Sequence, residues 1–176
     1  MAQAYPFAPA LLFMGLLVVK QFDLSLLYQK LQQNWGPIQT VSASEAFSYT
    51  DYYNQEMGEV PIRSFIIFTD LIDPSRLAQI KLQTNEIEHY FASDTGRQVN
   101  LDPGLLSAEN IILATTKHRG HRIPLEKGIY GEVTLLYTKN TYIDFPWTYP
   151  DYKSPQAKEF FLTQRQLYLQ RIRKGS

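Results

Sequence analysis

Cysteine is missing from all 176 residues of the sequence. This absence excludes disulfide bonds, thiolate zinc sites, iron–sulfur clusters and a cysteine nucleophile. It is consistent with a reducing compartment, so we expect a cytoplasmic protein.

Long hydrophobic runs are scarce. The strongest one, "ALLFMGLLVV" (Ala10 to Val19), has about half the length needed to cross a bilayer. No basic segment precedes it and no small-residue cleavage site follows it, which favours a buried β-strand over a signal peptide. We therefore expect no membrane partner.

Several catalytic fingerprints are also absent. There is no Gly-rich phosphate loop, no dinucleotide-binding glycine pattern, no nucleophile elbow and no HExxH motif. The commonest enzyme classes are therefore disfavoured, but the cofactor stays unknown, and whether the protein is an enzyme stays open.

The net charge is zero, with 17 basic and 17 acidic residues, so no global field favours nucleic acid or acidic membranes. The two halves nevertheless differ. Residues 1–88 carry a net charge of −4 and residues 89–176 a net charge of +4. An anion site is expected mainly in the second half.

Hydrophobic periodicity divides the chain into strands and helices. The first helix is expected to begin after Asp23 and to end at Gly36, and the second to begin at Pro74. The predicted strands cover residues 10–19, 37–43, 60–72, 96–101, 109–116 and 128–138, and the predicted helices cover 24–35, 74–91 and 155–173.

The order up to residue 102 is β-α-β, a connection, then β-α-β, which is typical of a ferredoxin-like split βαβ unit. We predict a single α+β domain over residues 1–176. Two further strands and a C-terminal helix extend the ferredoxin-like core, the mixed sheet is mostly antiparallel, and the helices cover one face.

Two polar segments follow predicted strands. In "NLDPG", Asp102, Pro103 and Gly104 indicate a turn, while Asn100 and Asp102 share one strand face and could point into a common pocket. "TTKHRGHRI" (Thr115 to Ile123) is either an exposed basic hairpin loop or an anion grip. His118 and His121 have a spacing that could hold a metal, but two loop imidazoles are weak evidence for one.

Other polar residues lie within predicted elements. On the helix over 74–91, Lys81, Thr84, Asn85 and Glu88 share one edge, which suits either an exposed polar face or a site wall. Glu132 points away from the predicted core face, either to solvent or into a cleft where burial would raise its pKa.

Aromatic residues gather in two segments and suit either ligand stacking or loops packed over the sheet. They are Tyr49, Tyr52 and Tyr53 in the first and Trp147, Tyr149 and Tyr152 in the second.

Six segments in this order resemble a bacterial and archaeal family, domain of unknown function 4416, over about residues 12–173. They are "TDYYNQEMG", "IKLQTNEIE", "VNLDPGLL", "LATTK" with "HRI", "KGIYGEVTLLY" and "PWTYPDY". The resemblance implies no particular activity. Because the shared segments are rich in polar residues, it favours one common site over scattered exposed faces.

The leading hypothesis is a cleft for an anionic small molecule, a phosphate or carboxylate, that is either binding or catalytic. We expect His121, Asp102 and Glu132 to be the acid, base or proton-exchanging groups. The expected ligand-binding residues are Lys81, Thr84, Asn85, Asn100, Thr116, Lys117 and Arg122.

The alternatives are a non-enzymatic module that binds protein or RNA, or an obligate oligomer with a polar interface. Presumed loops hold most of the aromatic residues, which argues against an RNA-reading sheet. The sequence fixes no oligomeric state.

Overall fold

The structure is a computed structural model that describes residues 2–49, 57, 60–94 and 96–175. Within them the chain has an α+β fold with one nine-stranded sheet and four α-helices. Every strand pair in the sheet is antiparallel.

The first elements follow their local sequence signals closely. Strand β1 (Ala10–Val18) is buried along its whole length, as its continuous apolar run requires. Helix α1 (Leu24–Trp35) begins where the Asp23 carboxylate accepts the Ser25 N–H at 2.9 Å. It ends at Gly36, whose φ of 83° suits glycine.

The second strand–helix–strand unit repeats this arrangement. Pro74 opens a short 3₁₀ turn, Pro74–Arg76, that leads into helix α3 (Leu77–Tyr90). The strands around these helices are β2 (Ile38–Val41), β3 (Glu45–Ala46), β4 (Ile62–Ile72) and β5 (Val99–Leu106).

The last third of the chain completes the sheet and covers it. Its strands are β6 (Asn110–Thr115), β7 (Ile123–Pro124), β8 (Tyr130–Thr138) and β9 (Thr141–Asp144). Two helices follow, α4 (Pro150–Lys153) and α5 (Pro155–Gly175). The sequence analysis did not predict β3, β7, β9 and α4, which are all short.

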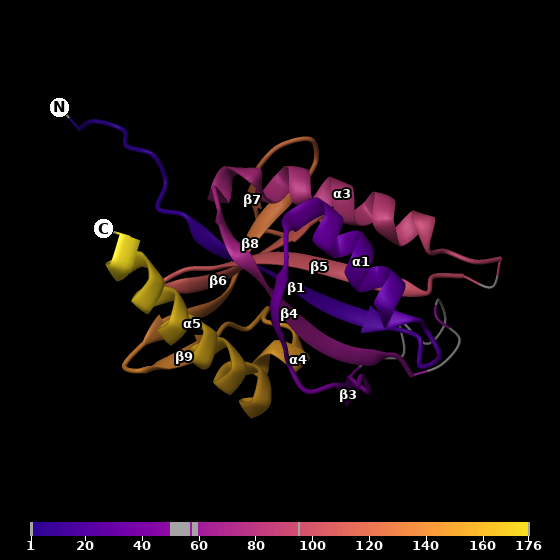
Figure 1. Cartoon of the computed structure of the whole chain (residues 1–176). Coiled ribbons are helices and arrows are strands. Elements are labelled where there is room, and N and C mark those ends of the chain that lie inside the picture. The colour runs from indigo at the N-terminus through magenta and orange to yellow at the C-terminus, as the bar shows by residue number, and fades with distance from the viewer. Residues whose placement is uncertain (1, 50–56, 58–59, 95, 176) are drawn as a thin grey trace.

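The strand order is β2-β4-β1-β5-β6-β8-β7, with β3 added to β4 and β9 added to β8. Helices cover both faces of this sheet, so the expectation of one helical face was wrong (Figure 1). Alternate β1 residues such as Leu12 and Met14 pack under α1 and α3, while Leu11 and Phe13 pack against α4 and α5. The two-sided core explains why β1 is apolar throughout.

The predicted turn at Asp102-Pro103-Gly104 was also wrong, because β5 runs straight through it. Backbone groups of alternate residues point to opposite sides of a strand. The Gln98 carbonyl accepts a hydrogen bond from Val19 next to β1, whereas the Leu101 backbone bonds to α3 on the other side of the strand. Pro103 lies two residues after Leu101, so the N–H that proline lacks would point away from β1. The proline therefore leaves the β1–β5 ladder intact.

Gly104 has a packing role. A Cβ at this position would overlap the ring of Phe13 and lie 2.6 Å from the carbonyl oxygen of Ile112. Glycine is needed here because an aromatic ring from β1 and the backbone of β6 both approach the strand closely.

Candidate functional site

The sheet opens between β5 and β6. Among the described residues, these strands pair only from Gly104 to Leu106, whereas Val99 to Asp102 pair with β1 alone. On the other side, Ala114 and Thr115 of β6 pair with β8 and with no other described strand. The two parts of the sheet therefore diverge from this point.

Two side chains of α3 form hydrogen bonds with backbone groups of β5 that the divergence of β5 and β6 leaves without a partner strand. Lys81 donates from Nζ to the Leu101 carbonyl at 2.8 Å, and Glu88 Oε1 accepts the Leu101 N–H at 2.8 Å. Both side chains are buried and lie 3.7 Å from each other. They act as a substitute for a neighbouring strand.

Burial raises the pKa of Glu88, an effect that the nearby Lys81 ammonium and the Leu101 N–H only partly offset. Arg97 adds a third charge, 3.8 Å from Glu88. It also donates to Asn100 Oδ1 at 2.7 Å, which links α3 to the first residues of β5.

A cavity of about 570 Å³ lies at the divergence and is lined by residues of α3, β4, β5, β6, β8 and α4. Its volume is in the range of roughly 300–1,000 Å³ that small-molecule sites occupy. Within the described part of the chain, nine charged residues line it, namely Arg63, Lys81, Arg97, Lys117, Arg122, Glu88, Asp102, Glu132 and Asp151.

Arg63 is the central cation of this wall, and the sequence analysis missed it. Its Nε donates to Asp151 Oδ2 at 2.6 Å, its Nη2 pairs with the same oxygen, and its Nη1 lies 3.3 Å from Asp102 Oδ2. To reach β5 from β4, the guanidinium crosses β1 at Gly15, where a Cβ would lie 2.8 Å from both Arg63 Nη1 and Tyr152 Oη. The glycine thus makes room for the bridge.

Aromatic rings surround this guanidinium. Its carbon lies 5.2 to 5.6 Å from the ring centres of Phe47, Phe65 and Tyr152. Burial lowers the pKa of Arg63, but Asp151, Tyr152 and Asp102 outweigh that effect, so its pKa is raised overall and the group stays charged. The sequence contained one indication of this role, because Arg63 is a charged residue at the start of a mostly apolar predicted strand.

Glu132 organises the opposite wall and is only 2% exposed. Its Oε2 accepts from Arg122 Nε at 2.6 Å and lies 2.9 Å from His121 Nε2. Arg122 also donates to the Lys117 carbonyl at 2.6 Å and to Tyr149 Oη at 3.1 Å. Of the two orientations expected for Glu132, the solvent-exposed one is wrong.

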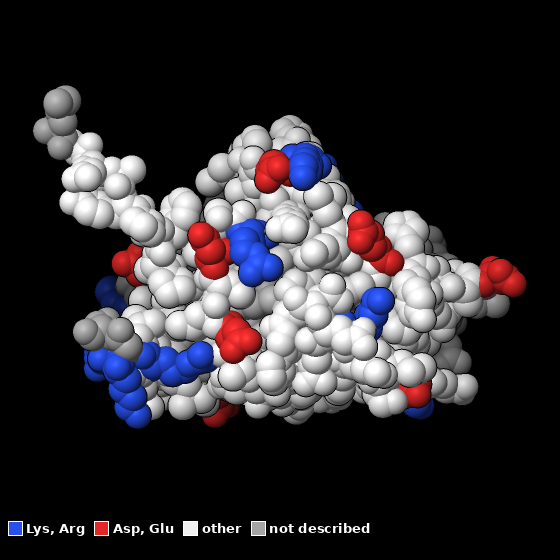
Figure 2. All heavy atoms as spheres, turned by 45° about the horizontal axis from the view of Figure 1, so that its top comes forward, with Lys and Arg blue, Asp and Glu red and all other residues white. Residues whose placement is uncertain are grey.

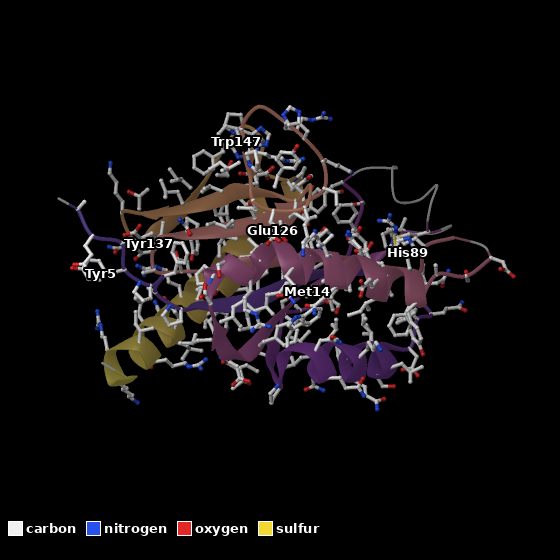
Figure 3. The ribbon with its side chains drawn as sticks, turned by 90° about the horizontal axis from the view of Figure 1, so that it is seen from above. Tyr5, Met14, His89, Glu126, Tyr137 and Trp147 are labelled. Atoms are coloured by element: carbon white, nitrogen blue, oxygen red, sulfur yellow. The ribbon has the colours of Figure 1, made fainter. Side chains whose placement is uncertain are left out.

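The cover over β8 comes from the segment after β9. Thr148 donates to the Thr134 carbonyl at 2.6 Å, and Trp147 Nε1 donates to the Val133 carbonyl at 3.0 Å. The Trp147 indole stacks on His121, with ring centres 4.6 Å apart and planes at 9°. Figure 3 shows Trp147 near the loop that carries β7, well apart from His89 at the end of α3.

Most of the residues expected at the site line the cavity. Eight do so: Lys81, Asn85, Asn100, Asp102, Thr116, Lys117, Arg122 and Glu132. Thr84 does not, because it is fully buried and donates its hydroxyl to the Lys81 carbonyl. His121 does not either, since it lies between Glu132 and Trp147. The loop of Thr116 and Lys117 is exposed, yet it forms part of the wall.

The aromatic residues divide in the same way. Tyr49 and Tyr149 line the cavity and are 45% and 41% exposed, whereas Tyr152 is buried in the core. Tyr52 and Tyr53 lie outside the described residues.

Three wall residues have a buried polar atom that lacks a hydrogen-bond partner within the described part of the chain. These atoms are Asn100 Nδ2, Glu132 Oε1 and Asp151 Oδ1. Each belongs to a side chain whose other polar atom is bonded. Such atoms are costly in a folded protein unless a water or a ligand satisfies them.

Among the described residues, no group of three or more acidic or histidine side chains is arranged to hold a metal ion. His118 packs edge-on against Tyr130, and His121 bonds to Glu132, so the two imidazoles have different partners. No helix in that part of the chain has the length and apolar character needed to cross a membrane.

The chain also matches one known protein family. Residues 8–168 match the model described as domain of unknown function (DUF4416). The match covers most of the chain, so the protein belongs to this family. No curated protein and no solved structure matches it significantly.

Proposed function

We propose that this protein is a small-molecule-binding domain whose ligand carries a phosphate or carboxylate group. The observation that carries the proposal is the cavity of about 570 Å³, whose wall has five cationic side chains and four carboxylates among the residues that the structure describes. The net positive wall favours an anion. On the face that Figure 2 shows, the two signs are mixed, apart from basic residues at the C-terminal end of α5, so the cavity is a better candidate for specific recognition than this face.

The anion is best accommodated near Thr116, Lys117 and Arg122. Three N–H groups of Arg122 are used by Glu132, the Lys117 carbonyl and Tyr149. A guanidinium has five N–H groups, so two remain for a ligand, and the three bonds fix their direction. This preorganisation reduces the entropy that binding would cost.

A catalytic role, as part of the proposal, falls to the wall carboxylates Asp102 and Glu132. His121 would act through Glu132, because it bonds to that carboxylate without lining the cavity. The Glu132–His121 contact supplies a route by which a proton could move between the cavity and the loop.

We also propose that the first half of the sheet is a ferredoxin-like unit. The strand order β2-β4-β1-β5, with every neighbour antiparallel, supports it. So do the positions of α1 between β1 and β2 and of α3 between β4 and β5 along the chain. On this view the cavity lies where the ferredoxin-like unit meets the added strands.

The binding proposal is tested by a thermal-shift screen with nucleotides, sugar phosphates, organic acids and divalent ions. A ligand at 100 times its Kd adds about 2.7 kcal/mol of stability, which for a chain of this size is roughly 5 to 10 °C in Tm. Lys117→Ala should reduce the shift. Arg119→Ala, on the same loop but outside the wall, should leave it unchanged.

Two outcomes would contradict the proposal. One is a screen in which no anion raises Tm. The other is a hit whose effect is equally large in the wild-type protein, Lys117→Ala and Arg122→Ala. Retention on a nucleic-acid column at low salt, without any small-molecule hit, would favour the RNA-binding alternative.

A further inference from the structure

We propose that the ligand is bipolar: besides its anionic group it carries a protonated amine, which the Asp102 and Asp151 side of the cavity recognises. This inference rests on the proposed binding function and specifies the class of ligand. It follows from how charge is distributed along the wall and from the buried atoms that lack partners.

The first argument is local charge. Arg63 is the one guanidinium that the described contacts join to Asp102 and Asp151, so this cluster of three has a net charge of −1. On the opposite wall Arg122 is paired with Glu132, so their charges cancel. A simple anion is therefore repelled beside Asp102 and Asp151, whereas a ligand that also carries a positive charge complements that side of the cavity.

The second argument is the unpartnered oxygen of Asp151. Oδ2 takes the bonds from Arg63, while Oδ1 is buried without a partner among the described residues. The Asp151 side chain is 3% exposed, so bulk water does not satisfy that oxygen. An ammonium group on this side of the cavity would donate to the carboxylates and offset the extra negative charge.

The third argument concerns the rest of the wall. Glu132 Oε1 is also unpartnered, but Arg122 already neutralises this carboxylate, so the oxygen suits a neutral hydroxyl donor rather than a cation. The amide of Asn100 has an unused donor for a ligand oxygen. An amine, hydroxyl groups and an anion on one small molecule describe an amino-sugar phosphate or a related amino compound.

The test compares matched ligands that differ only in the amine, using isothermal titration calorimetry on the full chain at neutral pH. The pairs are glucosamine 6-phosphate with glucose 6-phosphate, and phosphoethanolamine with ethyl phosphate. Because a charge-assisted hydrogen bond contributes about 1.5 to 3 kcal/mol, the amine should bind about tenfold more tightly or better.

Asp151→Asn should remove most of the amine preference without weakening the binding of glucose 6-phosphate, because it removes a negative charge that repels a simple anion. Asp102→Asn, at a more exposed carboxylate that should tolerate the change, provides the same test if the first variant does not fold. Glu126→Gln is the matched control, since Glu126 is exposed and outside the wall.

The outcomes separate the two proposals. If glucose 6-phosphate, ethyl phosphate or another anion of the screen binds and no amine improves the affinity, the bipolar ligand is refuted and the anion site stands. An amine preference that survives in both Asp151→Asn and Asp102→Asn also refutes it. If none of these ligands and no anion of the screen binds, both proposals fail.

Discussion

Replacing Arg63 with methionine should destabilise the protein strongly. Arg63 is 7% exposed, and its partner Asp151 is 3% exposed, so the substitution leaves a carboxylate with no cation in a buried position. Methionine has a similar length, which limits the loss of packing against the surrounding rings. The main effect is therefore electrostatic.

The expected size follows from other buried ion pairs. Removing one partner costs about 3 to 5 kcal/mol, which corresponds to roughly 6 to 20 °C in Tm for a chain of this length. Since native proteins are stable by only about 5 to 15 kcal/mol, we expect the single variant to lose a large share of its stability.

Urea denaturation followed by far-UV circular dichroism measures the change directly. Arg119→Met is the control, because this exposed arginine should change stability by no more than about 0.5 kcal/mol. The informative variant is the double substitution Arg63→Met with Asp151→Leu. Without either charge, it should recover most of the lost stability, since apolar replacements of a buried pair are often neutral or stabilising.

Two results would refute this reasoning. If Arg63→Met costs as little as Arg119→Met, the ion pair does not depend on burial as the structure indicates. If the double variant is at least as unstable as the single one, the loss comes from packing rather than from an unpaired carboxylate.

Two further predictions concern stability. Burial raises the pKa of Glu88, so this carboxyl group binds its proton more tightly in the folded protein than in the unfolded chain. The urea midpoint should therefore fall as the pH rises from the ordinary pKa of 4.5 through the raised pKa. Glu88→Gln should flatten this fall, and an identical slope in both proteins would contradict the assignment. Gly104→Ala should lower the free energy of unfolding by about 1 to 3 kcal/mol in urea denaturation, because its methyl group overlaps Phe13. Gly120→Ala, with open space around it, should be close to neutral. Equal effects of the two substitutions would count against close packing at Gly104.

Sequence patterns predicted elements best where the cause is local. The Asp23 cap, the Gly36 stop and the Pro74 start each fix a backbone conformation through neighbouring atoms, and the structure confirms all three. The Asp-Pro-Gly segment failed for the opposite reason. These residues favour a turn locally, but in the structure they pair with β1 as part of a strand. Gly104 lies opposite Phe13, whose ring leaves no space for a larger residue there.

The site shows the same division. Asn100 and Asp102 were expected to share a pocket because residues two apart on a strand face the same side, and both line the cavity. Arg63 was missed because its partners are 39 and 88 residues away in sequence, and only the strand order brings them together.

The sequence by itself determined the α+β class, the main strands and helices, and a set of polar positions, since those depend on composition, periodicity and local caps. Only the tertiary structure decided that helices cover both faces, that β5 and β6 diverge, and that Gly15 lets a guanidinium cross β1 to reach two carboxylates. These features depend on strand order and register, which are set by packing between segments far apart in the chain.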